Sequence, residues 1–266
     1  MLSLLLTQPH CEPLPTTLRT VAVDGLEITE CQPWHLEDIL DAALRDQGPA
    51  WQLATVNLDY LRCAHGDETL RQVLLACRHR FADGWPVLRL AQLRGYRYNR
   101  RVTGADLTRQ IWHWAKARGW RIGLVGGSER TAGLDEVLRR VWGPEVVAGM
   151  WQPWYRSSRR EDLRDPELCD RIRASRADIL LVGLGSPKQD LWLAENLGPS
   201  GARAGIGVGG SLSFLSGSVA RAPTWMQALQ LEFLHRMLSE PRRLSGRYFR
   251  DFVYLLQLLG RYGKGP

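Results

Sequence analysis

ADILLVGLGSPKQDLWLAENLG, residues 177–198, is the stretch of this 266-residue chain that decides its fold. Its first apolar run, Ile179 to Val182, is short and uninterrupted, which is typical of a strand buried on both faces. The glycine-containing segment 183–187 follows this run, and a helical pattern begins directly after it. A strand, a glycine loop and a helix in this order form the repeating unit of parallel α/β sheets.

The same unit occurs elsewhere along the chain. Short apolar runs at 122–125, 146–150 and 206–208 predict three more strands, and a helical pattern at 161–175 lies between two of them. Upstream, the segment 51–64 predicts a strand that ends near Asn57 and runs into a helix, and a further helix is expected from about Ala105 to Gly119. We therefore predict an α/β fold, a Rossmann-like parallel sheet with helices on both faces.

The two ends of the chain differ from this pattern. Residues 1–50 read as an irregular lead, because Pro9, Pro13 and Pro15 break any early helix, although 34–44 fits a short one. Residues 51–235 are assigned to the α/β domain. Residues 236–266 are assigned to a C-terminal appendage, in which polar residues recur every three or four positions beside a wide apolar face. This pattern predicts a basic, amphipathic helix.

Composition narrows the classes of protein. Hydrophobic residues make up 44% and charged residues 24%, which excludes a mostly disordered chain. Five scattered cysteines without a CxxC pair favour neither a disulfide framework nor a zinc site, so we expect a reducing cytoplasm. The six histidines show no metal-ligand spacing, and we expect neither a metal nor a cofactor. The start is a poor signal peptide, and no run approaches the roughly 18 apolar residues of a membrane span.

Positive charge gathers at the C-terminal end. The formal net charge is +7, and the segment 236–266 holds seven basic and two acidic residues, so it supplies +5 of that charge. Such a local excess attracts anionic lipid head groups, diphosphates or nucleic acid. If the protein meets a membrane, we expect it to lie on an anionic surface rather than to cross it.

Three glycine loops each follow a predicted strand, at 126–128, 183–187 and 207–211. Backbone N–H groups of such loops, together with the dipole of the next helix, bind phosphate groups. Gly185, Gly209 and Gly210 are therefore candidate ligand-binding positions. An NAD(P)-dependent oxidoreductase remains an alternative, although the G-x-G-x-x-G fingerprint is absent. A nucleic-acid-binding protein is a second alternative from the pI near 9.5, but the tryptophans lie in apolar segments that favour core packing.

The ordered set of motifs carries a resemblance. ADILLVGLGSPKQDLW (177–192), GIGVGGSLSFLSGSVARAP (205–223) and LEFLHRMLSEPRRL (231–244) follow TVN (55–57), ADG (82–84) and RVTGADL (101–107). Over residues 50–247 the chain resembles the WecG/TagA/CpsF glycosyltransferase family. Two positions depart from the family pattern: Asp190 stands where glutamate is common, and Phe233 where tryptophan is frequent.

This resemblance implies an inverting, UDP-sugar-dependent transferase without a catalytic metal, acting on a polyprenyl-diphosphate-linked sugar. Relatives build exopolysaccharide, capsule or teichoic acid at the inner face of the plasma membrane. A β-1,4-glucosyltransferase or an N-acetylmannosamine(uronate) transferase is a special case that the resemblance allows. The implied partners are the donor, the lipid-linked acceptor and an anionic membrane surface, without nucleic acid. Whether the chain forms a homo-oligomer is left open.

The resemblance also assigns site residues. Asp83 is the expected base, although an aspartate before Gly84 also suits a simple turn. The other implied active-site positions are Thr55, Asn57, Arg101 and Gln189, of which Asn57 fits a helix cap equally well. C-terminal arginines are implied to close over the site and to bind the acceptor's diphosphate, although several of them fit a solvated surface as well. These arginines are Arg221, Arg236, Arg242, Arg243 and Arg247.

Overall fold

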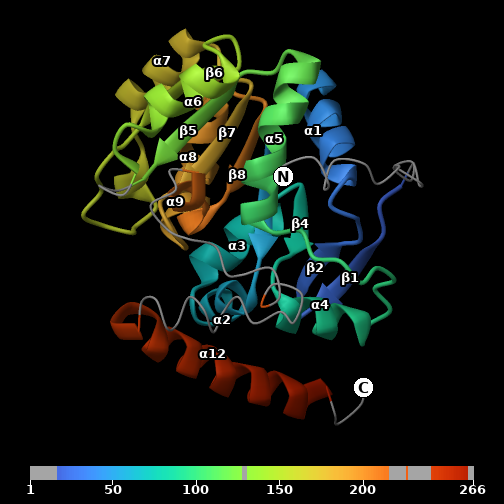
Figure 1. Ribbon diagram of the computed structural model, residues 1–266. Coiled ribbons are helices and arrows are strands. Elements are labelled where there is room, and N and C mark those ends of the chain that lie inside the picture. The colour runs from blue at the N-terminus through green and yellow to red at the C-terminus, as the bar shows by residue number, and fades with distance from the viewer. Residues whose placement is uncertain (1–16, 128–130, 216–225, 227–240, 263–266) are drawn as a thin grey trace.

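The computed structural model describes residues 17–127, 131–215, 226 and 241–262, and Figure 1 shows how their helices and strands are arranged. Within these residues the main sheet has six strands, all parallel. They are β3 (Trp51–Val56), β4 (His79–Ala82), β5 (Ile122–Gly126), β6 (Val147–Trp151), β7 (Ile179–Gly183) and β8 (Ala204–Gly207). Their order across the sheet is β4-β3-β8-β7-β5-β6. The predicted α/β class is confirmed.

Helices cover both faces of this sheet. Successive strand residues point to opposite faces, so Leu53 packs with one set of helices and Ala54 with the other. The first face carries α1 (His35–Arg45), α5 (Gly104–Arg118) and α6 (Leu134–Trp142). The second carries α2 (Leu58–Gly66), α3 (Glu68–Ala76), α4 (Trp85–Gln92), α7 (Pro166–Ser175) and α8 (Lys188–Ser200). The Rossmann-like arrangement predicted from the alternating pattern is therefore confirmed.

Both ends of α5 carry local signals. The Thr103 side chain caps α5 by accepting from the Asp106 N–H at 3.0 Å, and Gly119 ends that helix with a φ of 73°. The helix predicted at 161–175 is instead divided into a short 3₁₀ turn, η2 (Glu161–Leu163), and α7. Pro166 explains the division, because proline lacks an N–H and is suited to the first turn of a helix.

Residues 17–50 are more regular than the expected lead. They form a hairpin of β1 (Thr20–Val23) and β2 (Leu26–Thr29), followed by α1. Asp24 and Gly25 turn the hairpin, with φ values of 49° and 77°. An Asp-Gly pair favours this turn because both positions need positive φ. The prolines that suggested irregular structure, Pro9, Pro13 and Pro15, lie outside the described residues.

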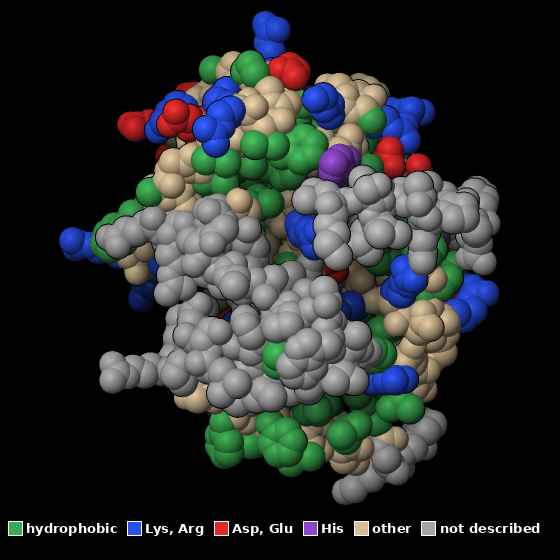
Figure 2. Space-filling model, in the orientation of Figure 1, with side chains coloured by type: hydrophobic (Ala, Val, Ile, Leu, Met, Phe, Trp, Pro, Cys, Tyr) green, Lys and Arg blue, Asp and Glu red, His purple; other side chains and the backbone are tan. Residues whose placement is uncertain are grey.

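The C-terminal segment forms α12 (Pro241–Tyr262), which confirms the predicted helix. It packs across α2 and lies outside the sheet and its covering helices (Figure 1). Leu244, Asp251, Tyr254 and Leu258 are buried against the rest of the protein. The apolar residues of the other side face solvent, and Figure 2 shows hydrophobic side chains at the lower edge of the view, where Figure 1 places α12. These residues are Phe249, Phe252, Val253, Leu256 and Leu259.

Helix α12 thus docks through a mixed, partly polar stripe and turns its apolar face outward. A docking helix ordinarily does the opposite, because burying apolar area is the main stabilising term in folding. None of the helices among the described residues has both the length and the hydropathy of a membrane-spanning segment.

Candidate active site

The carboxyl ends of the parallel strands lie at one edge of the sheet, and the chain reverses its direction of winding there. After β5 it continues into α6 on the first face, whereas after the neighbouring β7 it continues into α8 on the second. Ligands of open α/β sheets bind at such switch points, because the loops of the two strands diverge and leave a crevice. The predicted glycine loops lie at this edge.

Asp83 and Asn57 follow two neighbouring strands, β4 and β3. The Asp83 N–H donates to the Val56 carbonyl at 2.8 Å, so the chain after β4 runs directly beside the end of β3. A Cβ atom placed on Gly84 would lie 3.9 Å from the Cβ of Asn57. Asn57 also caps α2, since its side-chain oxygen accepts from the Tyr60 N–H at 3.2 Å. Asn57 therefore caps α2, as one of the two interpretations predicted. The cap uses only the side-chain oxygen, so the NH₂ group remains available for other contacts.

Arg101 is brought to the same place by the segment before α5. The N–H of Val102 donates to the Ala82 carbonyl at 3.0 Å. This bond brings the backbone of Arg101 next to the backbone of Asp83, at the end of β4. The segment then reaches the end of β8, where a Cβ on Gly104 would lie 3.3 Å from the Cα of Val208. Residues 101–104 therefore cross the strand ends from β4 to β8.

Thr55 bonds to the last residue of β8, and Gln189 bonds to the turn that follows it. The Thr55 hydroxyl donates to the Gly207 carbonyl at 3.3 Å, and Gln189 Oε1 accepts from the Gly209 N–H at 2.9 Å. Gly209 and Gly210 begin the 3₁₀ turn η3 (Gly209–Ser211), which leads into α9 (Leu212–Leu215). Five positions that the resemblance linked, Thr55, Asn57, Asp83, Arg101 and Gln189, thus come from four chain segments and lie at the adjoining ends of β4, β3, β8 and β7.

Gln189 is more enclosed than the sequence suggested. Only 2% of it is exposed, and its Nε2 donates to the Tyr60 hydroxyl while its Oε1 holds Gly209. Gly185, by contrast, has a φ of 77°, and a Cβ atom placed on it would meet no other atom within 4 Å, so it lines open space before α8. The ligand-binding role of both residues stays a prediction.

Asp190 and Tyr60 are buried behind this edge, and the sequence analysis gave neither of them a role. Both are almost inaccessible, and burial raises the pKa of Asp190 to about 7, with the neighbouring Tyr60 hydroxyl acting in the opposite direction. Among the described residues, neither carboxylate oxygen of Asp190 has a hydrogen-bond partner in bonding geometry. One sequence signal pointed to Tyr60: it lies three positions after Asn57, in the first turn of the helix that Asn57 caps.

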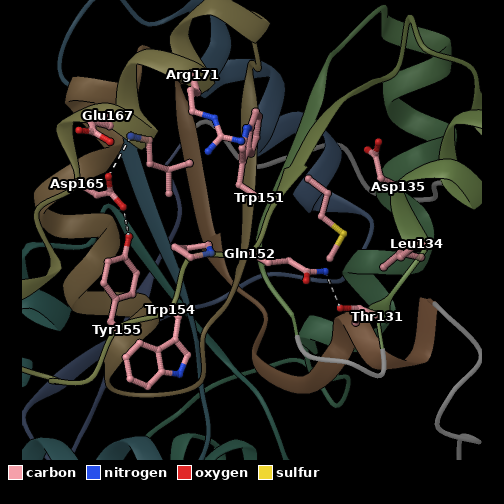
Figure 3. Close-up of a pocket in the computed structure, with 14 residues that line it drawn as sticks. Thr131, Leu134, Asp135, Trp151, Gln152, Trp154, Tyr155, Asp165, Glu167 and Arg171 are labelled. Carbon is pink, nitrogen blue, oxygen red and sulfur yellow. Dashed lines mark hydrogen bonds between the residues drawn. The ribbon is translucent and has the colours of Figure 1, made fainter.

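A cavity of about 570 Å³ lies beyond the ends of β5 and β6 (Figure 3). Its wall includes exposed Trp154, and two hydrogen bonds order the polar side chains: Gln152 donates to Thr131 at 3.3 Å, and Tyr155 to Asp165 at 2.8 Å. Helix α8 supports this wall, since Lys188 Nζ donates to the Tyr155 carbonyl at 2.7 Å. The cavity was not predicted, because its lining residues form no recognisable sequence motif and come together only when the loop after β6 folds against α7.

The C-terminal arginines are only partly covered by the structure. Arg221 and Arg236 lie outside the described residues, and for Arg242 and Arg243 only the backbone, in the first turn of α12, is described. Arg247 lies 3.4 Å from Asp59 and 3.8 Å from Asp251. It therefore contacts carboxylates of α2 and of its own helix. Within the described ranges, no group of three or more His, Cys, Asp or Glu side chains has the arrangement of a metal site.

A sequence model described as "Glycosyl transferase WecG/TagA/CpsF family" matches residues 21–265. The match begins in the N-terminal hairpin, includes all six parallel strands and continues through α12, so it extends beyond the motifs at 50–247. It also covers each strand end at which the candidate residues gather. With the family matched over nearly the whole chain, the protein belongs to the WecG/TagA/CpsF glycosyltransferases, enzymes that use a UDP-sugar to build cell-surface polysaccharide.

Proposed function

We propose that this protein transfers a hexose or N-acetylhexosamine-type sugar from its UDP carrier to a polyprenyl-diphosphate-linked sugar, with inversion at the anomeric carbon. The observation that carries the proposal is the convergence of Asp83, Asn57 and Arg101 at the adjoining ends of β3 and β4. In this proposal, a carboxylate, an amide and a guanidinium group at this place act on the donor and the acceptor.

The chemistry needs a base and a group that stabilises the leaving diphosphate. In the proposed reaction, the acceptor hydroxyl oxygen attacks the anomeric carbon while the bond from that carbon to the UDP oxygen breaks. Asp83 takes the proton of the attacking hydroxyl, and UDP leaves with the bonding electron pair. Arg101 and the N–H groups of the glycine loops stabilise the negative charge that develops on the diphosphate.

The cavity beyond β5 and β6 supports a nucleotide donor. Its volume of about 570 Å³ falls within the range of ordinary small-molecule sites. Trp154 offers an aromatic surface for stacking, and Gln152 offers an amide that can both donate and accept hydrogen bonds. In the proposed binding mode, a nucleoside in this cavity lies beside the glycine loop that follows β5.

The outward apolar face of α12 supports a peripheral position on an anionic membrane, at the inner face of the plasma membrane. Phe249 and Leu256 are 69% and 53% exposed, and the neighbouring Arg250 and Arg261 are also exposed. A helix that combines such a face with basic residues lies in the interface of an anionic bilayer. A membrane position also suits a polyprenyl acceptor, whose lipid part stays in the bilayer.

The decisive experiment screens UDP-sugars for release of UDP in the presence of a short-chain polyprenyl-diphosphate-sugar. UDP-glucose, UDP-N-acetylmannosamine and its uronic acid form the first panel. We expect release that requires the acceptor, and a β-linked product identified by its anomeric proton coupling. A product that retains the α configuration of the donor would contradict the inverting mechanism. Release at the same rate without acceptor would contradict the transfer itself.

A further inference from the structure

We propose that Tyr60 is a positioning residue, which acts through Gln189 to hold the loop after β8 in the arrangement that receives the UDP-sugar. The inference rests on the proposed function and adds a residue to the same site. Tyr60 belongs to α2, Gln189 to α8 and Gly209 to the turn after β8. One amide side chain therefore ties together the elements that follow β3, β7 and β8.

The hydrogen bonds of Gln189 fix the direction of its amide. Its Nε2 donates to the Tyr60 hydroxyl oxygen, and its Oε1 accepts from the Gly209 N–H at 2.9 Å. If the amide were turned over, an NH₂ group would face the Gly209 N–H, and two donors would meet. The Gly209 N–H therefore selects one orientation, and the Tyr60 oxygen accepts the N–H that this orientation presents.

The surroundings leave the amide no room to move. A Cβ atom on Gly207 would lie 2.6 Å from Gln189 Nε2 and 3.2 Å from Asp190 Oδ1, so the strand passes these side chains as closely as a glycine allows. Gln189 is 2% exposed, which keeps water from replacing either bond. Loss of the Tyr60 oxygen would leave a buried N–H donor without a partner, which is more costly than a lost surface bond.

Asp190 is a second polar group beside the Tyr60 hydroxyl. Its carboxyl group is fully buried and lies next to that hydroxyl, although neither carboxylate oxygen has a partner in bonding geometry among the described residues. A Tyr60 O–H that points toward Asp190 leaves the lone pairs of the Tyr60 oxygen free to accept from Gln189. The neighbouring Cys77 is buried, and burial raises the pKa of its thiol, so it stays neutral.

A double-mutant cycle on Tyr60→Phe and Gln189→Leu tests this inference. Tyr60→Phe removes only the hydroxyl oxygen, and we expect it to raise KM for the UDP-sugar about tenfold, roughly the cost of one buried unpaired donor. If Tyr60 acts through Gln189, the double variant should be no worse than Gln189→Leu alone. If Tyr60→Phe raised KM by the same factor in the wild type and in the Gln189→Leu variant, the inference would be overturned. A tyrosine that does not act through Gln189 has additive effects.

A matched control and a binding measurement complete the test. Tyr96→Phe also removes a buried hydroxyl, one that donates to the Cys31 carbonyl at 3.1 Å, and we expect no change in KM. Thermal melting of all variants shows whether they fold. Calorimetric titration with UDP measures Kd for the same four proteins, and we expect Tyr60→Phe to raise Kd about tenfold. If the wild type binds UDP but transfers no sugar, the proposed function fails while the cycle on Kd still decides the role of Tyr60. A wild-type-like Kd in Tyr60→Phe would overturn that role.

Discussion

The Nε of Arg62 in α2 donates to Oδ1 of Asp251 in α12 at 2.8 Å, although 189 positions separate the two residues. Only 23% of the Arg62 side chain and 8% of the Asp251 side chain are exposed. Arg62 also contacts Asp59, so it links two carboxylates at the start of α2 and the middle of α12. This ionic contact lies on the stripe of α12 that faces the protein, together with buried Tyr254 and Leu258, whereas the apolar stripe faces outward.

Breaking this contact should loosen α12 without unfolding the sheet. Arg62→Met leaves Asp251 partly buried without its main partner, which costs about 1–3 kcal/mol. We expect amide hydrogen exchange in residues 244–262 to accelerate about tenfold or more, with no change in β3, β5 and β7. Arg45→Met is the control, because Arg45 forms an exposed i,i+4 pair with Asp41 on α1. Unchanged exchange in α12 would show that apolar contacts alone hold the helix.

Removing apolar side chains from the outer face of α12 should weaken membrane binding. Phe252→Ser with Leu256→Ser removes two large side chains that are 56% and 53% exposed, so the fold should not depend on them. Sedimentation with phosphatidylglycerol vesicles should show at least a tenfold loss of binding, roughly the effect of losing two partly inserted side chains. The matched control is Val137→Ser with Val141→Ser, a similarly exposed pair on α6.

The α12 variant also distinguishes binding of the apolar face to a membrane from binding to a second copy of the chain. Light scattering without lipid measures the molar mass of the wild type and of the α12 variant. We expect a monomer in both cases. A wild-type dimer that dissociates in the variant, together with unchanged vesicle binding, would assign the apolar face to self-association.

Asp83→Asn should abolish transfer while leaving the protein folded. The substitution keeps the size of the side chain and its backbone bond to Val56 but removes the proposed proton acceptor. We expect kcat to fall by about 10²–10⁴, with KM for the donor changed little. Asp38→Asn, at a half-exposed position of α1, controls for the loss of one negative charge. Near-normal turnover in folded Asp83→Asn protein would assign this residue to the turn alone.

Two substitutions at Asn57 separate its cap from its proposed contact with the donor. Asn57→Asp keeps the oxygen that accepts from the Tyr60 N–H and suits the start of α2, so stability should stay close to that of the wild type. It replaces the NH₂ group, however, and we expect kcat/KM to fall roughly tenfold or more, the effect of one lost polar contact. Asn57→Ala should also lower the free energy of unfolding, by about 1 kcal/mol. If Asn57→Asp retained full activity, capping would be the whole role of this residue.

Asp190 should make stability fall as the pH rises from about 4 to about 7. Burial raises its folded-state pKa to about 7, so the folded protein retains a proton that the unfolded chain releases above its ordinary pKa. In that window the unfolded state binds fewer protons, and the free energy of unfolding decreases, by at most about 4 kcal/mol. Asp190→Asn should remove this slope. Urea titrations of both proteins at about pH 5 and about pH 8 measure it, and equal slopes would show that Asp190 stays charged in the fold.

The local sequence determined the elements and their order. Apolar runs followed by glycine loops, as in 179–187, are read from neighbouring residues alone, and so are the Thr103 cap and the Gly119 end of α5. Each depends on hydrogen bonds and backbone angles that span only a few positions. The parallel sheet followed, because strands that alternate with helices cannot return by a tight turn. The hairpin of β1 and β2 was not predicted, because its strands are short. Its apolar side chains gain stability only when they pack against the sheet.

Only the tertiary structure decided how the candidate residues meet and which face of α12 turns outward. The closeness of Tyr60, Gln189 and Gly209 follows from strand order, in which β8 comes last in the chain yet pairs with β3. The docking of α12 brings Arg62 together with Asp251, although 189 positions separate them in the chain. Neither result can be read from a local pattern, because each depends on groups that lie far apart in the chain until it folds.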